Sequence, residues 1–390
     1  MTDSSSSAEA ARLLEYSVVY NDRALNHMSG SFRRVMRRLS ATLKGVYGAD
    51  RVAVVPGGGT YAMEAVARQF GTGRRCLVVR NGWFSYRWTQ IFEAGSIPAG
   101  ETVLRARPID GGAAPSFAPS PVGEVATAIR EAEIEVVFAP HVETASGILL
   151  PDGYLREVGA AARSAGALFV LDCVASGASW VDMRELGVDV LISAPQKSWS
   201  SPPCAGLVML SERAARRVDP KADTAFSCGL SQWLWIMERY EAGAHAYHAT
   251  MPTDSLEILS RSMVETEAIG LGECAERQLE LGRRVRQVIS GSGFRSVAAP
   301  GFGAASVVVH HTDDPSIHDG SLFAEFGVRI APGVPLRCGE PEGMATFRVG
   351  LFGLDKLLNV DRTVERLERA VRGVVAASSS SSLRGRAPRG

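Results

Sequence analysis

Residues 168–172 (LFVLD) and 188–199 (VDVLISAPQKSW) are the stretches of the sequence that decide the predicted fold. The first is an apolar run that ends in Asp172, and the second is an apolar run that leads into a segment holding Lys197. Short, continuous runs of Val, Ile, Leu and Phe are typical of strands buried on both faces of a sheet. The two stretches therefore predict successive buried strands, with an acid at the end of one and a lysine just past the other.

The alternation of apolar runs with helical spacings extends on both sides of these stretches. Short apolar runs predict further strands at residues 52–55, 76–79, 134–139 and 207–210. Apolar residues at helical spacing predict helices at residues 32–46, 60–70, 84–92 and 154–164. Because short strands separated by helices imply a largely parallel sheet, we expect an α/β fold in which a mostly parallel sheet is sandwiched by helices.

The pattern changes after residue 210. Helical stretches at 232–240 and 255–289 form a long helical section, and short strands at 306–309 and 346–349 precede a helix at 360–371. We therefore expect a large domain over residues 15–264 and a smaller α+β domain over residues 265–375. The two ends, residues 1–14 and 376–390, are polar and low in complexity, which predicts disorder.

The charges of the chain balance, since Lys plus Arg and Asp plus Glu both number 42. This balance gives no electrostatic indication of a nucleic-acid or membrane-surface partner. No apolar stretch approaches the roughly 20 residues that span a bilayer, and the first residues lack the basic and apolar regions of a secretory signal. We therefore expect a cytoplasmic protein without a nucleic-acid or membrane partner.

The cysteines and histidines predict neither a disulfide framework nor a metal site. The six cysteines are scattered singly, and no two of them form a CxxC pair. His245 and His248 are spaced i, i+3, and His310 and His311 are adjacent, but no third ligand accompanies either pair. Reduced thiols in a metal-free enzyme are the simpler interpretation.

Lys197 and Asp172 suit the chemistry of one cofactor. A partly desolvated lysine can form a Schiff base with an aldehyde, and a buried carboxylate can hold a protonated pyridine nitrogen. This pair of groups is what pyridoxal phosphate requires. The chain's other lysines lack such a strand-end position: Lys44, Lys221 and Lys356. For either residue taken alone, a surface lysine or a structural acid remains the alternative.

Residues 54–60 (VVPGGGT) predict a site for a phosphate group. A strand, a glycine turn and a helix start follow one another, so that backbone N–H groups and a helix N-terminus face an anion. Thr60 is expected to add its hydroxyl as the N-cap. Residues 57–62 also match the dinucleotide fingerprint GxGxxA, but the next strand ends in Arg80 rather than in the acid that binds ribose. A tight structural turn is the third interpretation.

Three further segments supply chemistry. Residues 81–87 (NGWFSYR) offer aromatic faces for a heteroaromatic ring, with core packing as the alternative, and residues 141–147 (HVETASG) offer hydroxyls for a ring oxygen. Arg348 lies inside the apolar strand at 346–349, where a buried guanidinium needs a partner. A substrate carboxylate would be a bidentate match, and an internal salt bridge is the alternative.

Together, these segments resemble the class-V aminotransferases, the fold type I pyridoxal phosphate enzymes that include alanine–glyoxylate and serine–pyruvate aminotransferases. The resemblance runs from about residue 26 to residue 371. Five ordered motifs carry it: residues 57–60, 81–87 and 141–147, Asp172 with Gln196 and Lys197, and residues 346–353. It implies a homodimer with shared active sites that acts on small amino acids and 2-oxo acids. In two places the chain departs from the family: residues 20–27 replace a Gly-Pro-Gly segment that lines the substrate pocket, and Gly58 replaces a phosphate-binding serine.

The resemblance also implies a role for each site residue. Lys197 would be the Schiff-base lysine, and Asp172 would be the partner of the ring nitrogen. The rest of the cofactor would be held by Phe84 on the ring, Thr144 on the ring hydroxyl, and Gly58, Gly59, Thr60 and Gln196 on the phosphate. Tyr247 and Thr250 would reach the phosphate of the neighbouring subunit. The substrate would be bound by Arg348, through its carboxylate, and by Asn26.

The predicted function is transfer of an amino group from a small amino acid to a 2-oxo acid such as glyoxylate or pyruvate. Other functions remain open at this point. The same cofactor cradle serves pyridoxal phosphate lyases and cysteine desulfurases, for which Cys338 is the candidate thiol. An NAD(P)-dependent oxidoreductase and a non-catalytic ligand-binding module are the remaining alternatives.

Overall fold

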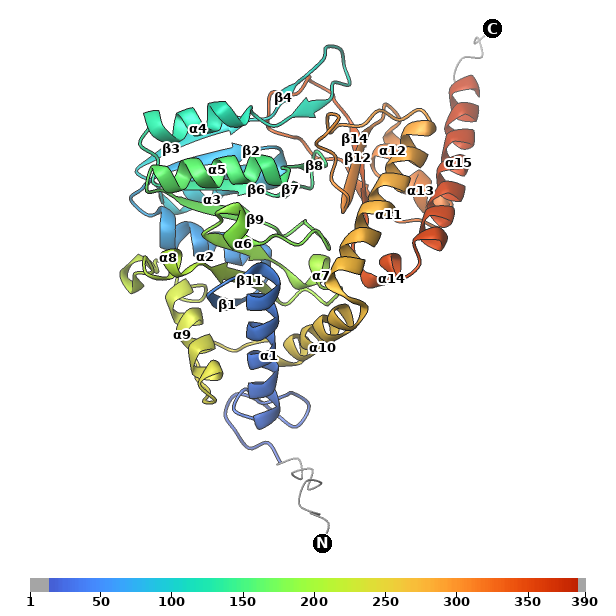
Figure 1. Cartoon of the computed structure of the whole chain (residues 1–390). Helices are drawn as coiled ribbons and strands as arrows, with labels where there is room; N and C mark the ends of the chain where they lie inside the picture. Colours follow the sequence, from blue (N-terminus) through green and yellow to red (C-terminus); the bar gives the residue numbers. More distant parts are fainter. Residues whose placement is uncertain (1–13, 385–390) are drawn as a thin grey trace.

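A seven-stranded sheet lies at the centre of the computed structural model, which describes residues 14–384 (Figure 1). Its order is β1-β11-β10-β9-β6-β2-β3. The strands are β1 Arg51–Pro56, β2 Arg75–Arg80, β3 Gly100–Arg105, β6 Val136–Pro140, β9 Leu168–Asp172, β10 Val190–Ser193 and β11 Ala205–Leu210. β11 is antiparallel to both of its neighbours, whereas the pairs from β10 to β3 are parallel. The expected mostly parallel sheet is therefore confirmed.

Strand β3 is the one strand of this sheet that the sequence did not predict. It lies at the edge of the sheet, and its residues (GETVLR) are exposed or only partly buried. An edge strand needs no continuous apolar run, because its outer side faces solvent. The pattern that marks the central strands is therefore missing there.

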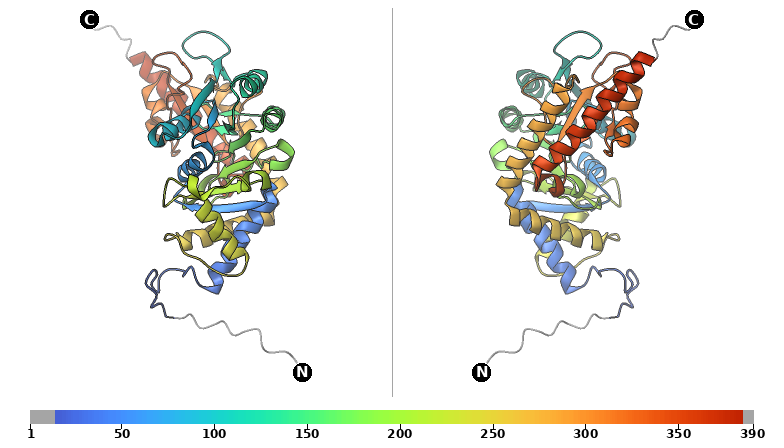
Figure 2. Two further views of the ribbon diagram at one scale, coloured as in Figure 1. Left: turned by 90° about the vertical axis from the view of Figure 1, so that its left-hand side faces the viewer. Right: turned by 90° about the vertical axis from the view of Figure 1, so that its right-hand side faces the viewer.

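Helices cover both faces of this sheet. Helices α4 (Val122–Glu131) and α5 (Asp152–Ser164) pack together on one face, and α2 (Gly59–Gly71) and α3 (Trp83–Gly95) pack together on the other. Figure 2 shows the two pairs on opposite sides of the sheet when the molecule is turned. The sandwich of helices predicted from the sequence is confirmed.

Helix α1 (Gly30–Tyr47) shows how local sequence sets these elements. The Ser29 side chain caps its start by accepting from the N–H of Phe32, and Gly48 ends it with a positive φ of 65°. One stripe of the helix is fully buried, with Phe32 and Leu39 at 0 % exposure. Burying each such side chain contributes about 1.5–3 kcal/mol, so packing of this stripe rather than helix propensity holds α1 in place.

Two helices replace the single long helical section that was expected between residues 255 and 289. They are α10 (Thr253–Ile269) and α11 (Leu271–Gly291), and Gly270 separates them. Gly270 has a φ of 103°, a conformation that interrupts a helix and that glycine adopts without a steric penalty. Apolar spacing continues through such a break, which is why the pattern did not reveal it.

A second, antiparallel sheet follows, in the order β12-β14-β13. Its strands are β12 Val307–His311, β13 Ala331–Pro332 and β14 Thr346–Gly350. Helix α11 and the C-terminal helix α15 (Val360–Arg384) lie side by side against it, as the right-hand view of Figure 2 shows. The small antiparallel sheet with helices is the α+β arrangement expected for this part of the chain.

Helix α15 continues into the segment 376–390, which was expected to be disordered, and ends only at Arg384. The helix is anchored by apolar side chains such as Leu367 and Val371, and the Ser378 hydroxyl donates to Asp314 Oδ2 at 2.6 Å. Once a helix is anchored, each further residue adds one hydrogen bond at little cost, so polar serines can extend it. Residues 1–13 and 385–390, for which disorder was also expected, lie outside the described residues.

The remaining elements are short. The strands are β4 Arg107–Pro108, β5 Phe117–Ala118, β7 Val142–Glu143 and β8 Ile148–Leu149. The helices are α6 Met183–Leu186, α7 Pro195–Ser198, α8 Glu212–Ala215, α9 Leu230–Glu241, α12 Pro315–His318, α13 Ser321–Glu325 and α14 Leu354–Leu357, with a 3₁₀ turn at Pro220–Ala222. Of these, α7 matters most for function because it carries Lys197.

The apolar core is divided into separate clusters. The largest cluster surrounds the main sheet and takes its residues from Phe32 to Met263, and a second is built almost entirely from residues between Cys274 and Val374. A third cluster joins the two parts of the chain. We propose to keep the domain boundary near residue 265, between the two main clusters. Limited proteolysis should cut near Gly270, the break between α10 and α11 that lies closest to this boundary, before it cuts within either cluster.

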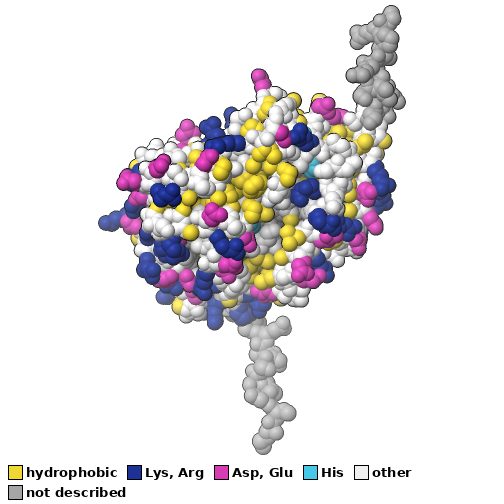
Figure 3. Space-filling model, turned by 45° about the horizontal axis from the view of Figure 1, so that its top comes forward, with side chains coloured by type: hydrophobic (Ala, Val, Ile, Leu, Met, Phe, Trp, Pro, Cys, Tyr) yellow, Lys and Arg dark blue, Asp and Glu magenta, His cyan; other side chains and the backbone are white. Residues whose placement is uncertain are grey.

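The surface carries mixed charges. On the face shown in Figure 3, Lys and Arg side chains alternate with Asp and Glu, and a strip of hydrophobic side chains runs between them. This mixture agrees with the zero formal net charge of the sequence. None of the helices within residues 14–384 combines the length and the apolar character needed to cross a bilayer.

Candidate active site

The carboxyl ends of the parallel strands bring the predicted site residues to one edge of the main sheet. β9 ends at Asp172, which pairs with Ile192 of β10, and α7 with Lys197 follows β10. The loops that follow β6 and β2 carry residues 141–147 and 81–87 to the same edge. Ligands of parallel sheets bind beyond the carboxyl ends of the strands, so this edge is the candidate active site.

Asp172 is buried, with 7 % of its surface exposed. Its Oδ1 accepts a hydrogen bond from the backbone N–H of Val174 at 2.9 Å. Burial raises the pKa of Asp172 to about 6, against the opposing effects of this hydrogen bond and of the Lys197 cation. A protonated ring nitrogen in contact with this carboxylate would supply the cation that stabilises its ionised form.

Lys197 lies near two aromatic rings. Its Nζ is 5.8 Å from the ring centroid of Phe84 and 5.3 Å from that of Phe352. Burial lowers the pKa of Lys197, while the Asp172 carboxylate raises it. A lowered pKa increases the fraction of neutral amine, which is the form that attacks a carbonyl or accepts a proton. Phe352 belongs to the motif at 346–353 but was not predicted as a site residue.

The Phe84 ring is the common neighbour of three cations. Besides the Lys197 amine, the guanidinium carbons of Arg87 and Arg348 lie 5.1 and 5.6 Å from its centroid. Arg348 donates from Nε to the carbonyl oxygen of Pro332 at 2.8 Å. No carboxylate within residues 14–378 forms an ion pair with Arg348, so the internal salt bridge considered for it is not found there. Its guanidinium can therefore bind a substrate carboxylate.

The predicted phosphate cradle is the turn between β1 and α2. Gly57 has a φ of 120°, and a Cβ built on it would lie 2.6 Å from the Tyr61 ring, so glycine is required there. A Cβ on Gly58 would meet open space, whereas one on Gly59 would lie 2.8 Å from Val174. No side chain of the described residues caps the start of α2, which leaves its first N–H groups available to an anion.

The prediction that Thr60 is the N-cap of α2 is wrong. The N-cap is Gly58, because the helix begins one residue earlier, at Gly59. The Thr60 hydroxyl instead accepts a hydrogen bond from Arg87 Nη1 at 2.9 Å. Arg87 was quoted in a motif but not predicted as a site residue, and it places a positive charge beside the cradle.

These residues fit pyridoxal phosphate. The uncapped start of α2 suits its phosphate, the buried Asp172 suits its ring nitrogen, and the amine of Lys197 suits its aldehyde. Gln196, next to the lysine, has a buried Oε1 without a hydrogen-bond partner in the described structure. An amide left unsatisfied in this way indicates a missing polar partner at the site.

Glu143 is a positioning residue that sequence reasoning missed. Its carboxylate is fully buried and accepts the backbone N–H groups of Phe84 at 3.2 Å and Ser85 at 2.8 Å, together with the Ser85 hydroxyl at 2.6 Å. A carboxylate at the N-terminus of a helix satisfies free N–H groups and complements the helix dipole, so Glu143 holds the start of α3 and with it Phe84. An acid three residues past the end of a buried strand was the signal available in the sequence.

The structure gives mixed support for the other predicted residues. Thr144 is partly buried beside Glu143, at the candidate site, but no hydrogen bond of its side chain is described. Asn26, Tyr247 and Thr250 lie elsewhere. The Asn26 amide donates to Glu15 at 2.8 and 2.9 Å, and the ring of His27 lies 5.5 Å from that of Tyr247.

Tyr247 and Thr250 therefore belong to a second cluster, formed by the N-terminal segment and the connection between α9 and α10. The Tyr247 hydroxyl is 3.1 Å from Thr250 Oγ1, and Tyr247 is 49 % exposed. No contact described for residues 14–378 joins Asn26, Tyr247 or Thr250 to Lys197 of the same chain. The three residues are not brought to the Lys197 site of their own chain.

Two other buried ionisable residues do not have the properties that the chemistry of the site requires. Asp189, at the start of β10, is buried but paired with Arg213 at 2.8 Å, which makes it a structural acid. Cys338, the candidate thiol of a desulfurase, is buried with its Sγ 3.5 Å from the carbonyl oxygen of Arg80. Burial raises the pKa of Cys338 to about 12, so the thiolate that a desulfurase needs is disfavoured.

The fold and the site together fit one class of protein, the α/β enzymes in which a lysine and an acid at adjacent strand ends serve pyridoxal phosphate. The family model described as Aminotransferase class-V matches residues 8–300. The chain belongs to the class-V aminotransferases, and the family predicted from the sequence motifs is confirmed. Membership of this family implies pyridoxal phosphate as cofactor.

Individual relatives are similar over most of the chain. A 2-aminoethylphosphonate–pyruvate transaminase of Paraburkholderia xenovorans is 27 % identical over 359 residues, which cover 88 % of this chain and 91 % of that protein. An L-aspartate–glyoxylate aminotransferase of Paracoccus denitrificans is 26 % identical, with coverage of 70 % and 67 %. The crystal structure of an alanine–glyoxylate aminotransferase from Nostoc sp. superposes with a TM-score of 0.73 at 22 % identity, covering 90 % and 89 %, and shows the same fold. The aminotransferase function predicted from the sequence agrees with these names.

Proposed function

We propose that the chain transfers an amino group from a small amino compound to a 2-oxo acid, with pyridoxal phosphate held by Lys197. The observation that carries this proposal is that the buried Asp172, at the end of β9, and Lys197, on α7 after the adjacent strand β10, lie at the same edge of the sheet. When bound, the cofactor would take up the amino group and delocalise the charge that develops at Cα. The relatives named for transamination to pyruvate and glyoxylate indicate the acceptors.

Each residue of the site has a part in this reaction. The Lys197 amine would accept the proton from Cα and deliver it to the aldehyde carbon of the cofactor, for which its lowered pKa is suited. The ionised Asp172 keeps a proton on the ring nitrogen, Arg348 orients the substrate carboxylate, and the start of α2 binds phosphate. The rings of Phe84 and Phe352 exclude water around the amine.

A donor screen tests this function. The cofactor-loaded protein is incubated with 2-aminoethylphosphonate, aspartate, alanine or serine as donor, and with pyruvate or glyoxylate as acceptor. We expect at least one pair to give the aminated acceptor and the matching carbonyl product in equal amounts, measured by chromatography. Loss of water from serine, or release of sulfide in a parallel incubation with cysteine, without amino-group transfer, would support a lyase or desulfurase instead.

We further propose a homodimer with shared active sites. Tyr247 and Thr250 are hydrogen-bonded to each other on an exposed cluster, and no contact described within residues 14–378 joins this cluster to the Lys197 site of the same chain. The resemblance to the family assigns these residues to the phosphate of the neighbouring subunit. A two-fold dimer would bring this cluster of each copy to the other copy's cradle.

Mixing two inactive variants tests the shared site. Lys197→Ala lacks the amine, and the double variant Tyr247→Phe/Thr250→Ala lacks the groups from the partner. Each alone should have little activity, but after unfolding and refolding together they should regain about a quarter of the wild-type activity, because half of randomly mixed dimers are mixed and each has one complete site. Activity that stays at the sum of the two separate variants would contradict shared sites. Light scattering reports the oligomeric state independently.

We also propose a cytoplasmic location. Six free cysteines suit a reducing compartment. Fractionation of cells, with the protein detected outside the cytoplasmic fraction, would contradict this location.

A further inference from the structure

A cavity of about 750 Å³ lies beside the candidate active site, between the ends of β2 and β3 and the loop that follows β13. We call it the arginine pocket, after three lining residues: Arg80, Arg105 and Arg337. Thr346, two residues before Arg348 on β14, also lines it. Gly333 lines it as well and follows the residue whose carbonyl accepts from Arg348. The arginine pocket therefore adjoins the proposed substrate carboxylate site.

Arg80 is a buried cation at the wall of this pocket. It is the last residue of β2 and only 5 % exposed, and its guanidinium carbon lies 4.6 Å from the Tyr86 ring centroid. Its Nη2 donates to Thr89 Oγ1 at 2.7 Å, but its buried Nε has no partner in the described structure. Buried guanidinium groups are normally paired, so Arg80 lacks an anionic partner. Burial and the neighbouring Arg105 lower the pKa of Arg80, which shows the cost of this state.

The loop after β13 holds Arg337 in an uncommon conformation. Arg337 has a φ of 60°, which few residues other than glycine adopt. Glu340 fixes this turn, because its Oε1 accepts the N–H of Arg337 at 3.0 Å and its Oε2 accepts the N–H of Cys338 at 2.9 Å. The Arg337 guanidinium then lies 5.4 Å from the Trp83 ring centroid. Unfavourable backbone conformations that the surroundings enforce are concentrated at binding sites.

The carboxylates near the pocket do not neutralise these arginines. Glu340 lines it but is engaged by backbone N–H groups. Glu101 reaches Arg80 only through Thr89, whose hydroxyl accepts from Arg80 Nη2 and donates to the Glu101 carboxylate. Glu342 is the other lining acid. No carboxylate of residues 14–378 forms an ion pair with any of the three arginines.

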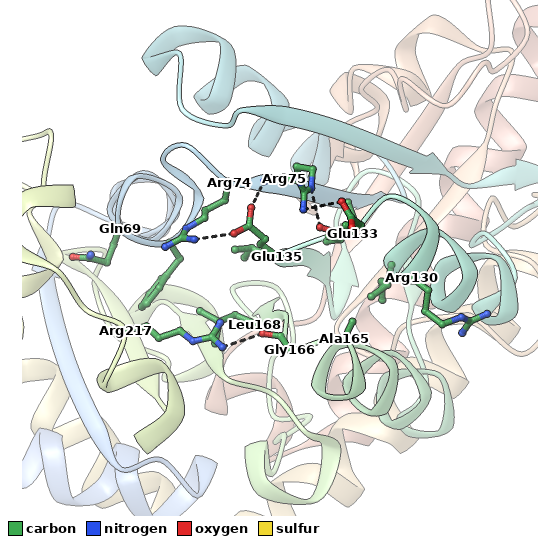
Figure 4. A pocket seen from close by; sticks show the side chains of 14 residues that line it. Gln69, Arg74, Arg75, Arg130, Glu133, Glu135, Ala165, Gly166, Leu168 and Arg217 are labelled. Carbon is green, nitrogen blue, oxygen red and sulfur yellow. Dashed lines mark hydrogen bonds and ion pairs between the residues drawn. The ribbon is translucent and has the colours of Figure 1, made fainter.

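A second cavity shows that this lack of partners is not general. It has a volume of about 710 Å³ and lies at the opposite edge of the sheet, at the amino ends of β2, β6 and β9 (Figure 4). Two of its arginines are paired: Arg74 with Glu135 at 2.8 Å and Arg75 with Glu133 at 3.3 Å. The other two arginines of that cavity, Arg130 and Arg217, donate to the Thr127 hydroxyl and to the carbonyl oxygen of Gly166. Half of the arginines lining that cavity thus have anionic partners within the described residues, whereas none of those in the arginine pocket does.

We propose that the arginine pocket binds an oxyanion, a phosphonate, phosphate or carboxylate group, carried by the amino donor or the 2-oxo acid at the end distant from the group held by Arg348. Planar guanidinium groups match such oxygens in two-point hydrogen bonds. This assignment rests on the proposed transaminase function for the role of Arg348. Free inorganic phosphate offers the same chemistry, and the experiment separates the two sources.

The first arm measures binding without turnover. Titration calorimetry on the cofactor-loaded protein uses inorganic phosphate and methylphosphonate as probes. The variant is Arg105→Gln/Arg337→Asn, because asparagine tolerates a positive φ and the buried Arg80 stays in place. We expect roughly ten-fold or more weaker binding in this variant, and none of this loss in Arg130→Gln, an exposed arginine of α4. Absence of binding to the wild type, or equal binding to the double variant, would overturn the proposal.

The second arm identifies the source of the oxyanion. KM and kcat are measured for aspartate, which carries a second carboxylate distant from the one held by Arg348, for alanine, which does not, and for 2-aminoethylphosphonate, whose phosphonate is its only anion. If the substrate is the source, KM in the double variant rises roughly ten-fold more for aspartate than for alanine. Equal changes for all donors, together with lost phosphate binding, would assign the pocket to free phosphate and refute the substrate as source. A chain that transaminates no donor would contradict the proposed function, while the binding arm would still report on the pocket.

Discussion

Lys197→Ala should lower the rate of amino-group transfer by roughly 10⁴-fold or more, because it removes both the amine that holds the cofactor and the group that moves the proton. The purified variant should also lack the visible absorbance that a lysine-bound pyridoxal phosphate gives. Initial rates with the best donor and acceptor, together with an optical spectrum, measure both effects. The large expected loss follows from the position of Lys197, the one lysine that the structure places beside Phe84, Phe352 and Asp172.

Lys221→Ala is the matched control. Lys221 is an exposed lysine of the 3₁₀ turn, far in sequence from the site motifs. Its replacement should leave the rate and the spectrum as in the wild type. A Lys197→Ala protein that keeps the absorbance and full turnover would contradict the assignment of the catalytic amine.

Asp172→Asn should lower the activity of the enzyme but raise the stability of the cofactor-free protein. The amide cannot hold the ring nitrogen of the cofactor in its protonated form, so we expect kcat to fall roughly 10²- to 10³-fold. The cofactor-free variant, in contrast, should be more stable than the wild type at pH 8. The reason is that the wild-type carboxylate has to ionise in a buried position, whereas an amide of the same shape stays neutral.

The pH dependence of this stability difference has a definite sign. The pKa of Asp172 is raised to about 6 in the folded protein, above its ordinary value of 3.8, so the folded state binds more protons between these values. The wild type therefore loses stability relative to the variant as pH rises from 4 through 6, by about 2 to 3 kcal/mol. Urea denaturation of both cofactor-free proteins at pH 4 and pH 8 measures the difference. A gap that is equal at the two pH values would refute the raised pKa.

Asp189→Asn is the control for this experiment. Asp189 is as buried as Asp172, but it is paired with Arg213 and accepts the backbone N–H of Phe169 at 3.0 Å. Its replacement should lower stability by about 1–3 kcal/mol, because a buried ion pair loses one partner. Two aspartates at the opposite ends of neighbouring strands should thus respond to the same substitution with opposite signs.

Much of the fold could be predicted because a strand that is buried on both faces of a sheet has a continuous run of apolar residues. The runs at 168–171 and 52–55 are continuous apolar segments, and the structure has a strand at each. A strand that is only partly buried, such as β3, lacks such a run. The break at Gly270 was missed because helical spacing continues across it.

Site residues could be predicted only where a reactive side chain lies just past a buried strand in the sequence. Asp172 and Lys197 were found because each lies just past an apolar run, and the structure brings both to one edge with Phe84 and Arg348. Glu143 was missed because its function depends on N–H groups of α3, about 60 positions away in the chain. No local pattern encodes such a partner.

By itself, the sequence determined the order of strands and helices, the family motifs, and the lysine and acid at the two strand ends, because each of these depends on a few neighbouring residues. Only the tertiary structure decided which charges have partners. Within the described part of the chain, Arg348 and Arg80 form no ion pair with a carboxylate, whereas Arg213 pairs with Asp189. Tyr247 lies in a separate cluster, away from the Lys197 site of its own chain. The physical reason is that electrostatic partners are selected by distance in space, whereas secondary structure is selected by the spacing of apolar residues along the chain.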